Sequence, residues 1–99
     1  MYDRVLRQMR EKIRTRQYVM TVHAEEEMAG DNLSIFDVEH VILTGEITER
    51  QKDRDTGEWK YLVEGETIAG DGLASHAMAV VVAKLSITNK LVMITVYVV

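Results

Sequence analysis

Two apolar stretches near the end of the chain decide the fold: residues 76–85 read HAMAVVVAKL and residues 91–99 read LVMITVYVV. Both are rich in β-branched residues and too short for long helices, so their composition favours β-strands. The polar segment between them, residues 86–90, is typical of a turn. The sequence therefore predicts an antiparallel hairpin at the centre of a sheet.

Side chains alternate between the two faces of a strand, so the hairpin also predicts which residues share a face. With an even number of loop residues, one face carries His76, Met78, Val80, Val82, Met93, Thr95 and Tyr97, and the other carries Ala77, Ala79, Ala83, Val92, Ile94, Val96 and Val98. We expect helices to pack on the alanine-rich face and the polar chemistry to lie on the first. An odd loop or a β-bulge changes this assignment.

The chain before the hairpin alternates between helical and strand patterns. Residues 2–14 have the spacing of an amphipathic helix, residues 17–21 a short extended segment, residues 21–30 and 34–45 two capped helices, and residues 46–51 and 58–66 a second hairpin. These patterns predict a single α+β domain over residues 1–99, with N-terminal helices packed on a four-stranded antiparallel β-meander.

The last two predicted strands are apolar on both faces, whereas three short helices cover only one face of such a sheet. Either the first helix crosses to the second face or a second copy of the chain covers it. A homodimer is therefore predicted.

Charge is distributed unevenly along the 99 residues, whose net charge is −4. Six basic residues lie between Arg4 and Arg16, whereas eight acidic residues and no lysine or arginine lie between Glu25 and Glu49. The basic segment fits a nucleic-acid contact, a docked arm or a solvated helix face. No apolar run is long enough to span a membrane and cysteine is absent, so we expect a cytoplasmic protein without membrane contact, thiolate metal site or cofactor.

Several short motifs resemble a small uncharacterised bacterial domain family that has a Thr-x-His-Ala-x-x-Arg-Met helix start and a Thr-Val-Tyr finish. They are Thr21-Val22-His23-Ala24 followed by Met28, and Thr95-Val96-Tyr97. The resemblance covers residues 18–98 and leaves the basic segment of residues 1–16 outside. The layout is also similar to that of the RelE and BrnT toxins, which implies a RelE/barnase-like fold.

The toxin resemblance implies metal-independent RNA cleavage, and histidine suits the acid and base roles because its ordinary pKa lies near neutral pH. On that reading His23 and His76 form the catalytic pair, Thr95 and Tyr97 hold the phosphate, and Arg50 or Lys60 binds the substrate.

Three other interpretations stay open. In the first, the ribonuclease activity has been lost. Glu27 stands where the family pattern has arginine, within the acidic run of residues 25–27, and acidic groups repel phosphate. In a second interpretation, the protein is a non-enzymatic, dimeric interaction or regulatory domain with a protein partner. In a third interpretation, His23, Glu26, Glu27 and His76 bind a metal ion. Histidines and aromatic residues are also common as plain structural residues.

Overall fold

A computed structural model describes residues 1–68 and 77–99 of the chain. Its elements in chain order are α1 (Asp3–Arg14), β1 (Tyr18–Met20), α2 (Val22–Gly30), α3 (Ile35–Thr44), β2 (Glu46–Lys52), β3 (Trp59–Glu66), β4 (Met78–Leu85) and β5 (Leu91–Val98). The predicted α+β class is confirmed. His76, which the sequence analysis placed at the start of a strand, lies outside the described residues.

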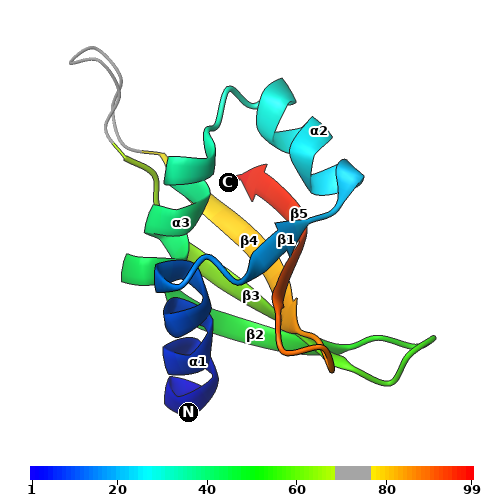
Figure 1. The fold of residues 1–99 in the computed structure, drawn as a ribbon. Helices are drawn as coiled ribbons and strands as arrows, with labels where there is room; N and C mark the ends of the chain where they lie inside the picture. The colour runs from blue at the N-terminus through cyan, green and yellow to red at the C-terminus, as the bar shows by residue number, and fades with distance from the viewer. Residues whose placement is uncertain (69–76) are drawn as a thin grey trace.

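The strands form one mixed sheet in the order β1-β5-β4-β3-β2 (Figure 1). β2, β3, β4 and β5 pair antiparallel, as predicted, with the β4–β5 hairpin inside the sheet. The predicted four-stranded sheet is corrected to five strands, because β1 adds to β5 in parallel. Its pairing is secured at both ends: the Leu91 amide donates to the Gln17 carbonyl and the Thr21 amide donates to the Met93 carbonyl, each at 3.0 Å.

The register of the β4–β5 hairpin departs from the predicted one near the turn. Leu85 pairs with Leu91, so the loop has an odd number of residues, and a bulge at Ile94 then restores the expected pairing of Val82 with Thr95 and Val80 with Tyr97. The predicted shared face of these last four residues is therefore confirmed. Met93 and Val92 exchange faces relative to the prediction, because they lie between the odd loop and the bulge.

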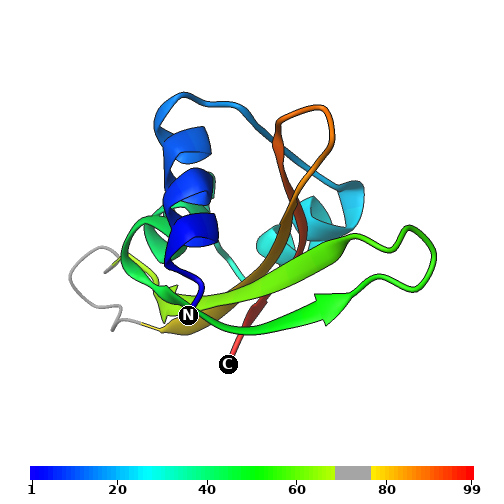
Figure 2. The same cartoon turned by 90° about the horizontal axis from the view of Figure 1, so that it is seen from below.

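All three helices lie on the same side of the sheet (Figures 1 and 2). We call that side the helix-covered face and the other the open face. The helix-covered face holds the hydrophobic core: Leu6, Met9, Ile13, Ala24, Val38, Val41, Ile42, Val63, Ala79, Val81, Ala83, Leu91, Met93 and Val96. Buried Ala79 and Ala83 let the helices approach closely, as the alanine-rich face predicted.

The open face hides much of its apolar surface within a single chain. Val80 is 4% exposed and Val82 is 8% exposed, although no helix covers them. Side chains of the two neighbouring strands flank them on that face: Leu62 and Glu64 of β3, and Thr95 and Tyr97 of β5, are their partners across the sheet. The homodimer stays a prediction, but its premise is weakened because these valines need no second copy to leave water. Met93, at 0% exposure in the core, is not part of a face that a second copy could cover.

One arginine of the basic segment joins α1 to the rest of the fold. Arg10 donates from Nε to the Ile42 carbonyl at 3.0 Å and from Nη2 to the Gly45 carbonyl at 2.7 Å. These are carbonyls at the C-terminal end of α3, where intrahelical donors run out and a positive charge complements the helix dipole. Arg10 therefore has a structural role that the charge pattern alone did not distinguish from those of its neighbours.

We expect Arg10→Ala to lower the free energy of unfolding by about 1.5–3 kcal/mol, because two charge-assisted hydrogen bonds to partly buried carbonyls are lost. Arg7→Ala, at an exposed position of the same helix, is the matched control and should change stability by less than about 0.5 kcal/mol. Urea denaturation of both variants measures the difference. Equal stabilities would show that the Arg10 contacts contribute nothing.

Candidate functional site at the margin of the sheet

The first turn of α2 is fixed to the outer margin of β5 by Thr21. Its hydroxyl accepts a hydrogen bond from the Ala24 amide at 3.1 Å, which caps the helix, and donates to the Ile94 carbonyl at 2.9 Å. Ala24 is fully buried beneath this turn, where a small side chain lets the helix lie close to the strand. Thr21 and Ala24 of the Thr-x-His-Ala sequence thus fix the position of α2 against β5.

Glu27 covers the part of the β5 edge that β1 does not reach. β1 pairs with β5 only as far as Met93, and further along the strand the Val96 amide donates to Glu27 Oε1 at 3.0 Å. An unpaired strand edge exposes backbone groups that need partners, and this carboxylate supplies one. The carboxylate is therefore held in place by the sheet.

His23 lies one helical turn before Glu27 and contacts the same carboxylate. Its Nε2 is 3.4 Å from Glu27 Oε1, and its side chain is 66% exposed, against 25% for Glu27. A carboxylate beside one ring nitrogen of histidine selects the tautomer and orients the ring. With Nε2 carrying the proton towards Glu27, Nδ1 is the nitrogen that can accept a proton from a substrate. We call these two residues the His23–Glu27 pair.

Thr95 and Tyr97 flank Val96 on β5, so the His23–Glu27 pair lies beside the strand segment that carries them. Both belong to the open face, where Thr95 is opposite Val82 and Tyr97 is opposite Val80. Lys60 belongs to the same face, because its neighbour Tyr61 packs on the core. The structure thus brings Thr95, Tyr97 and Lys60 to one face, with His23 at its margin.

Lys84 was not among the predicted site residues, yet it lies on this face opposite Val92. Its Nζ is 3.0 Å from Glu58 Oε1, and both side chains are largely buried. The alternation of side chains in the sequence predicts which face of the sheet Lys84 lies on. Only the strand register shows that it lies between Val92 of β5 and Lys60 of β3.

Arg50 lies apart from the other predicted site residues. It is on β2, at the opposite edge of the sheet, three strand spacings or about 14 Å from β5. It pairs with Tyr61 and therefore points to the helix-covered side, where its guanidinium is 4.0 Å from the centre of the Trp59 ring. Lys52 approaches the same ring at 5.7 Å. These are cation–π distances, so the far end of the sheet combines positive charge with an aromatic surface.

The predicted metal ligands do not gather in the described part of the chain, where no group of three or more His, Asp or Glu side chains is placed to hold an ion. Glu26 is exposed, and Glu27 is occupied by the Val96 amide. His76, the proposed second catalytic histidine and alternative metal ligand, lies outside the described residues.

The helices and the mixed sheet define a small α+β domain with a His–Glu pair at the margin of the sheet. No helix within residues 1–68 and 77–99 is long and apolar enough to cross a membrane. The chain belongs to a family described as a domain of unknown function, DUF4258, whose model matches residues 20–98. The expected membership of a small uncharacterised domain family is confirmed. The match leaves α1 outside. No curated protein and no solved structure matches the chain.

Proposed function

We propose that this protein is a metal-independent ribonuclease of the toxin-like kind that RelE and BrnT represent, with His23 as its general base. The observation that carries the proposal is the His23–Glu27 pair, in which an exposed imidazole is oriented by a carboxylate that is itself held by the Val96 amide. A base fixed in this way resembles the carboxylate–histidine arrangements of known acid–base catalysts.

In the proposed reaction His23 Nδ1 removes the proton of a ribose 2′-hydroxyl. The 2′-oxygen then attacks the adjacent phosphorus, the bond from phosphorus to the 5′-oxygen breaks, and the products are a 2′,3′-cyclic phosphate and a free 5′-hydroxyl. A second group must protonate the leaving oxygen, and the toxin resemblance assigns that role to His76. The Thr95 and Tyr97 hydroxyls are the nearby donors for the phosphate oxygens.

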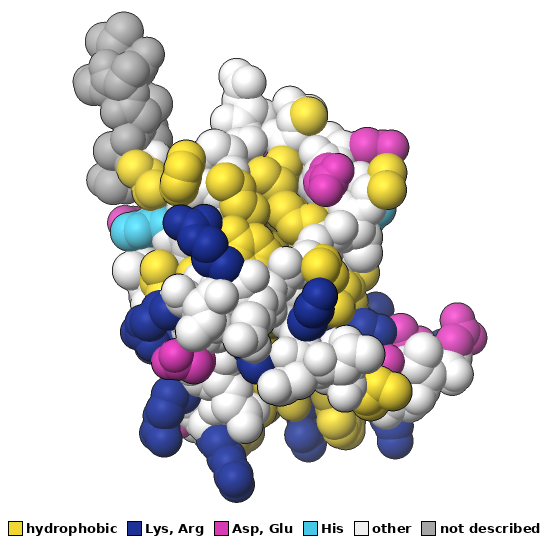
Figure 3. Space-filling model, in the orientation of Figure 1, with side chains coloured by type: hydrophobic (Ala, Val, Ile, Leu, Met, Phe, Trp, Pro, Cys, Tyr) yellow, Lys and Arg dark blue, Asp and Glu magenta, His cyan; other side chains and the backbone are white. Residues whose placement is uncertain are grey.

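Charge placement supports contact with a polyanion away from the cleavage point. All 12 lysines and arginines lie within residues 4–16 and 50–90, so none falls on α2 or α3. The fold gathers many of them around α1 and the β2–β3 hairpin, where most of the dark blue side chains in Figure 3 lie. Trp59 adds a stacking surface there, and Lys60 links it to the open face. Neighbouring phosphates and bases of one RNA strand can use these positions.

The acidic run of α2 is split by the helix geometry. Residues advance by about 100° per position, so His23 and Glu27 share one flank of the helix, and Glu25 lies on the other side of the buried stripe that contains Ala24 and Met28. Glu27 is engaged by the Val96 amide and balances the imidazole when it is protonated. The negative charge of Glu27 therefore acts on the His23 base and not on the phosphate.

We expect purified protein to cleave single-stranded RNA in the presence of EDTA and to leave 2′,3′-cyclic phosphate ends. The same oligonucleotide with 2′-deoxyribose throughout should stay intact, because the attacking hydroxyl is missing. Lys60→Ala should weaken RNA binding and reduce its salt dependence, whereas Lys90→Ala, at an exposed position in the loop between β4 and β5, is the matched control. RNA that stays intact at micromolar protein, or cleavage that requires a divalent metal, would contradict the proposal.

A further inference from the structure

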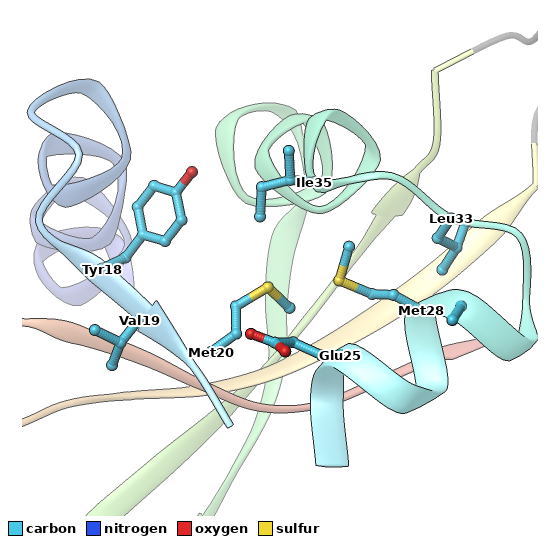
Figure 4. Close-up of a pocket in the computed structure, with 8 residues that line it drawn as sticks. Tyr18, Val19, Met20, Glu25, Met28, Leu33 and Ile35 are labelled. Carbon is cyan, nitrogen blue, oxygen red and sulfur yellow. The ribbon is translucent and has the colours of Figure 1, made fainter. Parts of the chain in front are cut away.

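An apolar groove of about 520 Å³ opens between β1, α2 and α3 (Figure 4). His23 and Glu27 are not among the residues that line it. Its lining includes Tyr18, Met20, Glu25, Met28, Leu33 and Ile35. Figure 3 shows the corresponding apolar surface in the upper half of the molecule, facing the viewer. Two methionines contribute to it, and their flexible side chains adapt to the shape of a bound group.

One wall of the groove is an unpaired strand edge. Gln17 and Thr21 bond towards β5, and alternate residues of a strand direct their backbone groups to opposite sides, so the amides and carbonyls of Tyr18 and Met20 point away from β5. Within the described residues no hydrogen bond pairs them, because β1 pairs with β5 alone. The groove therefore offers a partner both apolar side-chain space and free backbone hydrogen bonds.

The polar groups around the groove indicate which chemistry fits. Glu25 lies in its lining, and no lysine or arginine occurs from residue 17 to residue 49. At the Tyr18 end, Glu39 accepts the phenol hydrogen bond at 2.5 Å, and burial together with this carboxylate raises the pKa of Tyr18 to about 12. The positive charge of Arg16 acts on the pKa of Tyr18 in the opposite sense. Two copies of this acidic edge would repel each other, which argues against self-pairing.

We propose that this groove binds an extended segment of a different protein, which adds to the edge of β1 as a sixth strand. Apolar side chains of the segment enter the groove between α2 and α3, and a lysine or arginine of the segment pairs with Glu25. Strand addition of this kind takes affinity from backbone hydrogen bonds and specificity from pockets for alternate side chains. The inference does not rest on ribonuclease activity, because it uses the opposite flank of α2.

The test is a selection of random 12-residue peptides displayed on phage against the wild-type protein. We expect enrichment of peptides that carry apolar residues at every second position and a lysine or arginine at another position of the same alternation, so that both kinds of side chain face the groove. In hydrogen-exchange NMR, a synthetic copy of an enriched peptide should slow exchange of the Tyr18 and Met20 amides. Glu25→Lys should weaken binding of that peptide at least tenfold, whereas Glu26→Lys, an exposed neighbour outside the groove, should leave it unchanged.

A second variant and a modified peptide keep the test independent of any one substitution. Ala29→Arg fills the groove from an exposed helix position and should abolish binding. A peptide N-methylated at alternate residues should bind only when the methylated edge faces away from β1. The proposal is overturned if no peptide is enriched, if enriched peptides are acidic, or if they bind Glu25→Lys and Ala29→Arg like wild type. Binding without protection of the Tyr18 and Met20 amides also overturns it.

Discussion

Gly45→Ala should destabilise the protein by about 3 kcal/mol or more, which lowers the melting temperature by roughly 12 °C or more for a chain of this size. A Cβ atom at Gly45 would lie 2.4 Å from the Glu64 carbonyl oxygen and 2.6 Å from the Val41 carbonyl oxygen. Both are backbone atoms, so no side chain can move aside to relieve the contact. The backbone φ of −84° is open to any residue, and glycine is required here for space alone.

The effect is large because this contact joins the helical layer to the sheet. Gly45 ends α3 and directly precedes β2, and Gly65 of β3 lies against it, with its own added Cβ only 2.9 Å from the Gly45 Cα. Moving α3 outward would separate Val41 and Ile42 from the core. Gly30→Ala is the matched control: nothing lies within 4 Å of the added Cβ, so stability should stay the same or rise by up to about 1 kcal/mol. Thermal unfolding of both variants that gave equal midpoints would contradict this account.

His23→Ala should reduce the rate of RNA cleavage by about 10²- to 10⁴-fold, which is the usual contribution of a positioned general base. The side chain is 66% exposed and makes no core contact, so the variant should melt close to wild type. His40→Ala, on α3, removes a histidine away from the sheet margin and should leave the rate unchanged. Single-turnover cleavage of one RNA oligonucleotide measures all three proteins.

Glu27 gives a second, separable readout at the same site. Glu27→Gln keeps an oxygen acceptor for the Val96 amide but loses the carboxylate charge 3.4 Å from the His23 ring, so the cleavage rate should fall while stability is retained. Glu27→Ala should lose both, because the β5 edge is left without a partner at Val96. Equal cleavage rates for wild type and His23→Ala would remove His23 from the mechanism, whatever the behaviour of Glu27.

The elements of the fold could be predicted wherever the deciding interaction was local. The capping box at Ser34 and Asp37, the helix end at Gly45 and the apolar strands were all readable, because each depends on residues within a few positions of one another. Residues 17–21 were predicted as an extended segment, but their place as a fifth strand was not, because the parallel partner of β1 lies more than 70 positions later. The bulge at Ile94 was equally hidden, since nothing in its residue type distinguishes it from a paired position.

The same difference between local and long-range interactions decided what could be predicted of the site. The sequence placed His23 and Glu27 on one helix face only as possible ligands of a metal ion, in the third interpretation, whereas in the structure the carboxylate accepts a hydrogen bond from a strand amide 69 residues away. Lys60 and Arg50 were equivalent as cations in the sequence. The register separates them, because the bulge between Ile47 and Glu49 sets Arg50 on the helix-covered side. The groove beside β1 could not be predicted from the sequence, because it forms only where three elements and a strand edge come together in the fold.

The most direct test of the central claim, that the His23 imidazole is the base, is chemical rescue. RNA cleavage by His23→Ala is measured with and without added imidazole at constant pH and ionic strength. We predict that imidazole restores cleavage in proportion to its concentration, in EDTA and at the bonds that wild type cuts, and does nothing for a Thr95→Ala variant. Cleavage by His23→Ala that stays at the level of buffer with imidazole alone would contradict the account.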